Sequence, residues 1–416
     1  MKLCFVTATR PHAGGMVNCL NNYVVGAKKL GHQAEIVSIF ETSQQRKKMQ
    51  KLDDRLGEIL KNKDWLGFLA FQTIKLIIFF RFLKNYLQKR YDLVYVTDIV
   101  AYNAIKPLEK IFKIPVILNP IDSVYSILVS KKLARPGSWF MKYVIKQEKK
   151  AYGGAKAMLT NGLDMAKYFQ KIADRDLLIP RIEIPIDDQK FYVDQKEGER
   201  LRKKFNLENK FVVLYTGRLS SEKGIIYLLR AIPEILKVEP KNNIFIAICG
   251  AAGPEKENLV NYIKNNQYED YAKVLGYIKD DEMRGVYNMA DVFCAPTVNF
   301  EGEAAAYLNS GTRKNNKLEY TISTANTTVQ EAMACGQPVI TTDIAGSREL
   351  IKENIDGLLV LEKNPKALAE AVLKLKNDQQ LRQKLAAEAL NSVKERYLPA
   401  TVVQFLLDFY KIIFKS

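Results

Sequence analysis

The sequence predicts an α/β protein built from two doubly wound domains. Short runs rich in Val and Ile alternate with helical patterns in both halves of the 416-residue chain. Such runs, separated by helices, are what a parallel sheet covered on both faces requires. The length exceeds that of one ordinary domain. With 47% hydrophobic and 26% charged residues, the composition is that of a chain with packed cores.

The predicted strands follow one another in two sets. In the first half they are KLCFVTA (2–8), QAEIVSIF (33–40), DLVYVTD (92–98), PVILN (115–119) and AKAMLTN (155–161). In the second half they are FVVLYTG (211–217), NIFIAICG (243–250), KVLGYI (273–278), DVFCAP (291–296), PVITT (338–342) and GLLVL (357–361). Pro185 and a charged stretch mark a linker between the sets. We therefore expect domains at 1–187 and 188–398, followed by a last helix within 399–416.

Charge is distributed unevenly along the chain. Residues 1–190 carry 32 Lys and Arg against 17 Asp and Glu, whereas the remainder carries 31 against 29. A strongly basic half suggests a polyanionic partner, either nucleic acid or an anionic membrane. No nucleic-acid motif is present, and the aromatic residues near the charges lie in an apolar helix, so no nucleic-acid partner is expected.

Cysteine usage and the amino terminus indicate a compartment. The five cysteines are scattered without a CxxC pair, and most lie in apolar runs, as buried reduced thiols do. The start, MKLCFVTATR, lacks a long apolar signal core and a small-residue cleavage site. The expected location is cytoplasmic, with peripheral contact to the cytoplasmic face of a membrane.

The helical segment at 65–91 is the reason for expecting membrane contact. It is apolar around most of its circumference, and its length approaches that of a membrane span. Lys75 and Arg81 interrupt it, and a crossing would place strands of one sheet on opposite sides of a bilayer. An aromatic-rich helix lying among lipid headgroups is the favoured interpretation. A helix packed in the first domain or a dimer interface is the alternative.

Two loops have the layout of anion sites. After the first strand, Gly14 and Gly15 permit close backbone approach before a helix that starts near Met16, where free N–H groups can bind an anion. After the strand at 211–217, Arg218 and Lys223 leave the carboxyl end of the sheet, where ligands of open α/β sheets bind. Two such cations can hold a diphosphate and offset charge on a leaving group. The alternative is that both are solvated surface cations.

The segment NTTVQEAMACG (326–336) points to a ribose site. Asn326, Thr327 or Thr328 can cap a short helix that carries Glu331 in its first turn or so. An ionised carboxylate accepts two neighbouring hydroxyls at once, as a ribose 2′,3′-diol offers. Gly336 is expected to end the helix. The alternative is a glutamate stabilised only by the helix dipole.

Together these segments resemble the family 4 glycosyltransferases of GT-B fold. The resemblance rests on MKLCFVTATRPHAGG, LGHQAEIVS, YTGRLSSEKG, ADVFCAPT, QEAMACGQPVITTDIAGSRELI and DGLLV, which run in order over nearly the whole chain. It implies two Rossmann-like domains facing a cleft, with a UDP- or GDP-type sugar donor on the second domain and an acceptor mainly on the first. It also implies a C-terminal helix that packs back on the first domain, and catalysis with retention and without a metal or other cofactor.

The resemblance assigns roles to individual residues. Arg218 and Lys223 match the pair that binds the donor diphosphate and assists its departure. Glu331 matches the glutamate that binds the ribose. Gly14 and Gly15 match the loop near the donor phosphates.

Two departures from the family pattern affect the expected site. The family's first glutamate lies eight residues before the second, and that position is Ser323 here. We expect Glu301, or else Glu303, to contact the transferred sugar, with 300–321 looping out as an insertion. The histidine common after the fourth strand is Ile121 here, which leaves Asp122 as the nearest polar candidate to orient an acceptor or sugar hydroxyl.

The expected function is transfer of a sugar from a nucleoside diphosphate to a hydroxyl of a lipid-linked or polysaccharide acceptor. A non-catalytic GT-B-fold protein that binds carbohydrate or a partner is the alternative. The two departures from the family pattern are what keep that alternative open.

Overall fold

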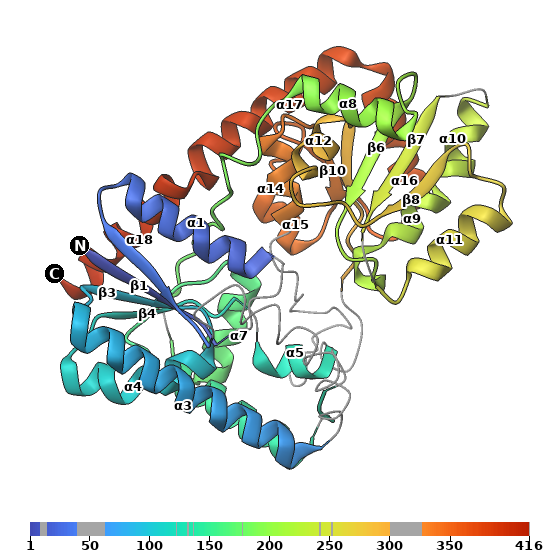
Figure 1. Ribbon diagram of the computed structural model, residues 1–416. Coiled ribbons are helices and arrows are strands. Elements are labelled where there is room, and N and C mark those ends of the chain that lie inside the picture. Colours follow the sequence, from blue (N-terminus) through green and yellow to red (C-terminus); the bar gives the residue numbers. More distant parts are fainter. Residues whose placement is uncertain are drawn as a thin grey trace. The chain divides into compact units, whose positions relative to one another are not determined.

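The computed structural model describes residues 1–8, 15–39, 63–121, 123–130, 133–135, 137–176, 178–240, 243–250, 253–299 and 327–415. Contacts divide these residues into two compact units (Figure 1). Unit 1 is Met1–Pro185 with the C-terminal helix α18 (Pro399–Phe414), and the described residues of unit 2 lie within 186–299 and 327–398. Gly14, Asp122, Glu301 and Glu303, with the insertion at 300–321, lie outside the described residues.

Unit 1 is a five-stranded parallel sheet in the order β2-β1-β3-β4-β5. Its strands are β1 (Lys2–Val6), β2 (Gln33–Val37), β3 (Leu93–Val96), β4 (Val116–Leu118) and β5 (Ala157–Met158). Its other helices are α1 (Gly15–Lys29), α3 (Asp64–Lys89), α4 (Ile99–Phe112), α5 (Val124–Ser130), α6 (Trp139–Gly154) and α7 (Leu163–Ala173). Chain order reverses between β1 and β3, so the topological switch point of this unit lies there.

Unit 2 is a six-stranded parallel sheet in the order β11-β10-β9-β6-β7-β8. Its strands are β6 (Phe211–Thr216), β7 (Ile244–Cys249), β8 (Ala272–Gly276), β9 (Val292–Ala295), β10 (Val339–Thr342) and β11 (Leu358–Val360). Its helices are α8 (Gln195–Phe205), η1 (Ser221–Lys223), α9 (Ile225–Arg230), α10 (Ile232–Val238), α11 (Lys256–Asn265), α12 (Met283–Asn288), α14 (Thr327–Ala334), α15 (Ala345–Leu350), α16 (Pro365–Asn377), α17 (Gln379–Ser392) and η2 (Val393–Tyr397). This is the Rossmann strand order, with its switch point between β6 and β9.

Every strand that the sequence predicts is present. The central strands of both sheets are buried on their two faces, because the runs are apolar at consecutive positions: Phe211–Thr216 and Ile244–Cys249 are buried at every residue. Parallel strands need helical crossovers, and these cover both faces of each sheet.

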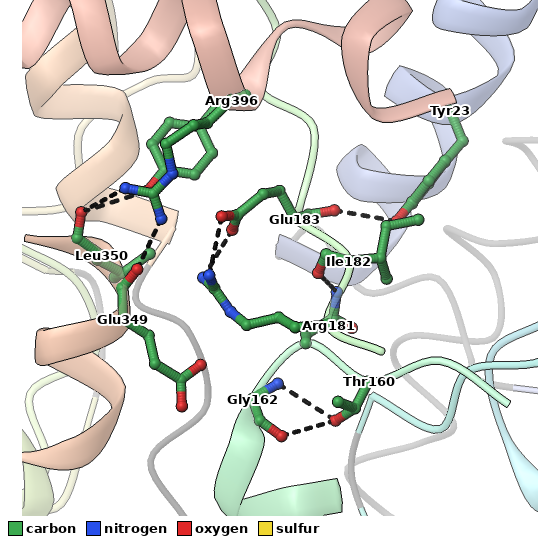
Figure 2. A network of polar contacts seen from close by, with 11 residues as sticks. Tyr23, Thr160, Gly162, Arg181, Ile182, Glu183, Glu349, Leu350 and Arg396 are labelled. Carbon is green, nitrogen blue, oxygen red and sulfur yellow. Dashed lines mark hydrogen bonds and ion pairs between the residues drawn. The ribbon is translucent and has the colours of Figure 1, made fainter. Parts of the chain in front are cut away.

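Polar contacts fix the segments where the chain leaves each unit (Figure 2). In unit 1, Arg181 pairs with Glu183 through two hydrogen bonds of 2.9 and 2.7 Å, and Tyr23 of α1 donates to the Glu183 carbonyl at 3.2 Å. In unit 2, Arg396 of η2 donates to the carbonyls of Leu350 at 3.2 Å and Glu349 at 2.6 Å, at the end of α15. The two bonds from Arg396 satisfy carbonyls at the end of α15, which intrahelical bonds leave free.

Candidate active site

The loop after β6 is built around glycines. Gly224 has φ +63°, and a Cβ at this position would lie 1.9 Å from the carbonyl oxygen of Pro296, just after β9. Val298 N donates to the carbonyl of Glu222 at 2.9 Å. These contacts tie the loop after β6 to the loop after β9 at the switch point of the sheet. That is the place where open α/β sheets bind ligands.

Arg218 lies on this loop with its side chain 74% exposed. Its guanidinium is 3.5 Å from the carboxylate of Glu222, which also accepts a 2.6 Å hydrogen bond from Ser220. The hydroxyl of Tyr215, in β6, anchors the loop by donating a 2.8 Å hydrogen bond to the Arg218 carbonyl. The backbone is therefore anchored while the charged group reaches solvent. Lys223 lies half-buried at the end of η1.

Glu331 is connected to the start of the same loop by hydroxyl groups. Tyr287 of α12 donates to one Glu331 oxygen at 2.5 Å, and the Tyr287 oxygen is 2.8 Å from the hydroxyl of Thr216, the last residue of β6. A phenol has one proton, so with Glu331 as its acceptor, Tyr287 must receive its second bond from Thr216. The carboxylate thus lies two hydrogen bonds from a residue that precedes Arg218 by two positions.

The protonation of Glu331 is finely balanced. Burial raises the pKa of its carboxyl group to about 7, against the lowering effects of the Tyr287 hydrogen bond and of Lys190. Lys190 itself is held by Asp280 at 2.5 Å. Within the described residues, no group donates to the second Glu331 oxygen. That oxygen can accept a hydroxyl from a ligand once the group is ionised.

The position of Glu331 in its helix is close to the expected one. Within the described residues helix α14 begins at Thr327, so Glu331 is its fifth residue and lies just past the first turn. Thr327 and Thr328 are the first two described residues of the helix, and Asn326, the other candidate for its cap, lies outside the described residues. The helix dipole acts mainly on the first turn, so the role of Glu331 rests on its contacts instead. Gly336 ends the helix as expected, with φ +72°.

In unit 1, an unpredicted carboxylate organises the end of β1. Asp98, 7% exposed, accepts hydrogen bonds from Ala8 N at 2.6 Å, the Thr7 hydroxyl at 3.1 Å and Ala101 N at 2.8 Å. It therefore fixes the strand end that leads into the Gly14 and Gly15 loop, and it caps α4. The sequence signal was an Asp directly after an apolar strand and before a helix. Gly15 is the first residue of α1.

A second unpredicted carboxylate is Glu148 of α6, which is fully buried. It accepts hydrogen bonds from the Ser123 hydroxyl at 2.9 Å and the Tyr168 hydroxyl at 2.7 Å. Burial raises its pKa. Its place next to Ser123 fixes the segment after β4 at residues 123–125. Across the described residues, no three His, Cys, Asp or Glu side chains are close enough to hold a metal ion.

Two doubly wound parallel sheets, each with helices between its strands, define a Rossmann-like class of α/β protein. Residues 210–378 match the family model described as Glycosyl transferases group 1. An uncharacterized glycosyltransferase of Methanocaldococcus jannaschii is 28% identical over 201 residues, which are 48% of this chain and 45% of that protein. The putative teichuronic acid biosynthesis glycosyltransferase TuaC of Bacillus subtilis is 26% identical over 259 residues, 62% and 56% of the two chains. The chain thus spans about half the length of these curated relatives.

The fold has relatives over its full length. Anabaena HepE, solved in complex with UDP, superposes with a TM-score of 0.64 at 16% identity, covering 98% of this chain and 99% of that chain. The predicted fold class, α/β with two Rossmann-like domains as in GT-B, is confirmed. The resemblance to the family 4 glycosyltransferases is confirmed as well.

Proposed function

We propose that this protein transfers a sugar from a nucleoside-diphosphate sugar to a hydroxyl of a lipid-linked or polysaccharide acceptor, with retention of configuration. The observation that carries the proposal is the connection of Glu331 through Tyr287 and Thr216 to the loop of Arg218 and Lys223. A carboxylate and a cationic loop at one switch point suit the two ends of a nucleoside diphosphate, a ribose diol and a diphosphate.

Each group has a defined task in this proposal. Ionised Glu331 accepts the ribose hydroxyls through the oxygen that Tyr287 leaves open. The Arg218 guanidinium, whose one ion-pair partner within the described residues is Glu222, turns to the diphosphate. With Lys223 it offsets the charge that builds as the diphosphate leaves. In a retaining reaction on one face of the sugar, the leaving phosphate accepts the proton of the acceptor hydroxyl. Glu301 contacts the donor sugar and Asp122 orients a hydroxyl in this scheme.

The relatives support the classes of donor and acceptor. HepE was solved with UDP, which favours a UDP-type donor over a GDP-type donor. The name of TuaC refers to teichuronic acid biosynthesis, which favours a polysaccharide acceptor. No further cofactor takes part in the proposed reaction.

Turnover of donor tests the proposal. Wild type, Arg218→Ala and Lys223→Ala are incubated with UDP- and GDP-sugars and lipid extracts, and the release of nucleoside diphosphate is measured. Each variant should lose at least about a hundredfold in turnover, the loss typical of removing one electrostatic stabiliser. Lys237→Ala, an exposed lysine of α10, is the matched control. Unchanged turnover in the two variants contradicts the assignment, and binding without turnover by the wild type favours the non-catalytic alternative.

A further inference from the structure

Helix α3 turns an apolar face to solvent. Six large apolar side chains along it are between 37% and 63% exposed; this α3 stripe comprises Trp65, Leu69, Leu76, Ile77, Phe80 and Leu87. Their spacing of mainly three, four and seven residues places them along one side of the helix. The helix has 26 residues and extends about 39 Å at 1.5 Å per residue. In a surface helix of a soluble protein, the side that faces solvent is normally polar.

The opposite side of α3 belongs to the core of unit 1. Phe71, Ile78, Phe82 and Tyr86 are all less than 10% exposed. The helix follows β2 and precedes β3, and both of these strands pair with β1 in one sheet. Figure 1 shows α3 running along the outside of this unit. The α3 stripe therefore lies on the solvent-facing side of a helix that is packed into unit 1.

Helix α6 packs beside α3 and adds positive charge next to the stripe. The ring of Trp139, 53% exposed, lies 5.6 Å from that of Phe68, and Gln72 donates to the Tyr143 hydroxyl at 2.6 Å. From this contact a lysine row, Lys142, Lys146 and Lys150, runs along the exposed side of α6 at four-residue intervals. The one acidic residue of α6, Glu148, points into the core. No member of the lysine row forms an ion pair with a described residue.

Two helical stretches of the described chain are long and apolar enough to cross a bilayer on those criteria alone, Asp64–Lys89 and Gln379–Phe414. For α3, a crossing would separate its buried side from the sheet and would place β2 and β3 on opposite sides of the bilayer. Lying in the plane of the membrane surface conserves the fold and buries only the apolar side.

We propose that the α3 stripe and the lysine row form a docking surface for the headgroup region of an anionic bilayer. The stripe inserts among the upper acyl chains, while the three lysines contact anionic headgroups. A second copy of the chain fits less well, because pairing through the same surface would bring two lysine rows together. The surface does not depend on the proposed transfer reaction, so either proposal can fail without the other.

The tryptophans of the chain provide a direct readout. There are two, Trp65 at the start of the stripe and Trp139 at its junction with α6. Both are more than half exposed. Adding phosphatidylcholine vesicles that contain phosphatidylglycerol should shift their emission to the blue, and brominated acyl chains should quench it. Pure phosphatidylcholine vesicles should give a much smaller change, and added salt should reverse the binding.

Variants identify the surface. Leu76→Ser with Phe80→Ser should lower the vesicle partition coefficient about tenfold or more. Lys142→Gln with Lys146→Gln should lower it about fivefold per lysine on anionic vesicles and leave weak binding to neutral vesicles unchanged. Val260→Ser on α11 and Lys366→Gln on α16, exposed positions of unit 2, are the matched controls.

Three results would overturn the proposal. The first is tryptophan emission that does not respond to anionic vesicles. The second is equal binding by the stripe variant and its control. The third is a lipid-free dimer, measured by sedimentation, that Leu76→Ser with Phe80→Ser dissociates, since this would assign the stripe to a second copy.

Discussion

Replacing Glu331 with glutamine should change how stability depends on pH. The folded-state pKa of Glu331 is about 7, above the ordinary value of 4.5, because the carboxyl group is buried. The folded protein therefore binds this proton more tightly than the unfolded chain does. The resulting stabilisation is complete below pH 4.5 and is lost as the pH rises to 7. The amide side chain in the Glu331→Gln variant does not titrate, so the variant lacks this loss.

The magnitude follows from the pKa shift. A shift of this size corresponds to about 3 kcal/mol for a group fully removed from water. The carboxyl group is buried, but part of the Glu331 side chain is still in contact with solvent, and this screening reduces the value to about 1–2 kcal/mol. For a unit of this size, each kcal/mol changes the melting temperature by about 2–4 °C. Between pH 5 and 8 the melting temperature of the wild type should therefore fall by about 2–8 °C more than that of Glu331→Gln.

Scanning calorimetry at a series of pH values measures the effect, with the transition of unit 2 followed separately because two units need not melt together. Glu370→Gln is the control, because Glu370 is 67% exposed on α16 and its removal should leave the pH profile parallel to that of the wild type. Parallel profiles for wild type and Glu331→Gln would refute the argument that Glu331 is buried with a raised pKa.

Three further predictions concern Gly224 in the loop after β6, the Tyr287–Glu331 hydrogen bond, and Asp98 at the start of α4. Gly224→Ala should destabilise unit 2 by about 2 kcal/mol or more, because the new Cβ would lie 1.9 Å from the Pro296 carbonyl oxygen. The control Gly276→Ala, where φ is +79° and the space around the Cβ is open, should cost only about 1 kcal/mol. Equal losses in melting temperature for the two variants would contradict this. Tyr287→Phe should raise the Glu331 pKa, because the lost hydrogen bond stabilises the carboxylate. The pH at which the affinity for UDP-glucose is halved should therefore move upward, which titration calorimetry from pH 6 to 9 measures. An unchanged midpoint of this pH dependence would count against the Tyr287–Glu331 contact. Asp98→Ala should lower the stability of unit 1 by about 2–4 kcal/mol, because it leaves the buried N–H groups of Ala8 and Ala101 unpaired. Asp98→Asn should cost less, because one acceptor oxygen remains. Equal melting temperatures for the two variants would be inconsistent with this role of Asp98.

The strands could be predicted because each is a continuous apolar run between helical patterns. Phe211–Thr216 and Val292–Ala295 need no knowledge of their partners to be recognised, since burial on both faces makes every position apolar. The place of Arg218 after β6 followed directly from this, because the carboxyl end of a parallel strand is where a ligand site forms.

The contacts that complete the site could not be predicted in the same way. Tyr287 is 44 residues from Glu331 in the chain, and only the tertiary fold of unit 2 brings the two side chains together. The raised pKa of Glu331 depends on that packing, so no local pattern signals it. Asp98 left a local signal, as a helix cap after a strand, but its second contact to Ala8 is a long-range one.

The outward face of α3 illustrates another limit. Its sequence is apolar around most of the helix, which favours a membrane surface but also fits a buried helix or a dimer contact. Only the fold separates the side that packs in the core, with Ile78 and Phe82 fully buried, from the side with Leu76 and Phe80 more than half exposed.

A crystal structure of the protein bound to UDP tests the central claim most directly. We predict that the ribose hydroxyls lie within hydrogen-bonding distance of the Glu331 carboxylate, with the diphosphate contacted by Arg218 and Lys223. A nucleotide bound away from the loop after β6, or a ribose that Glu331 does not contact, would contradict the account.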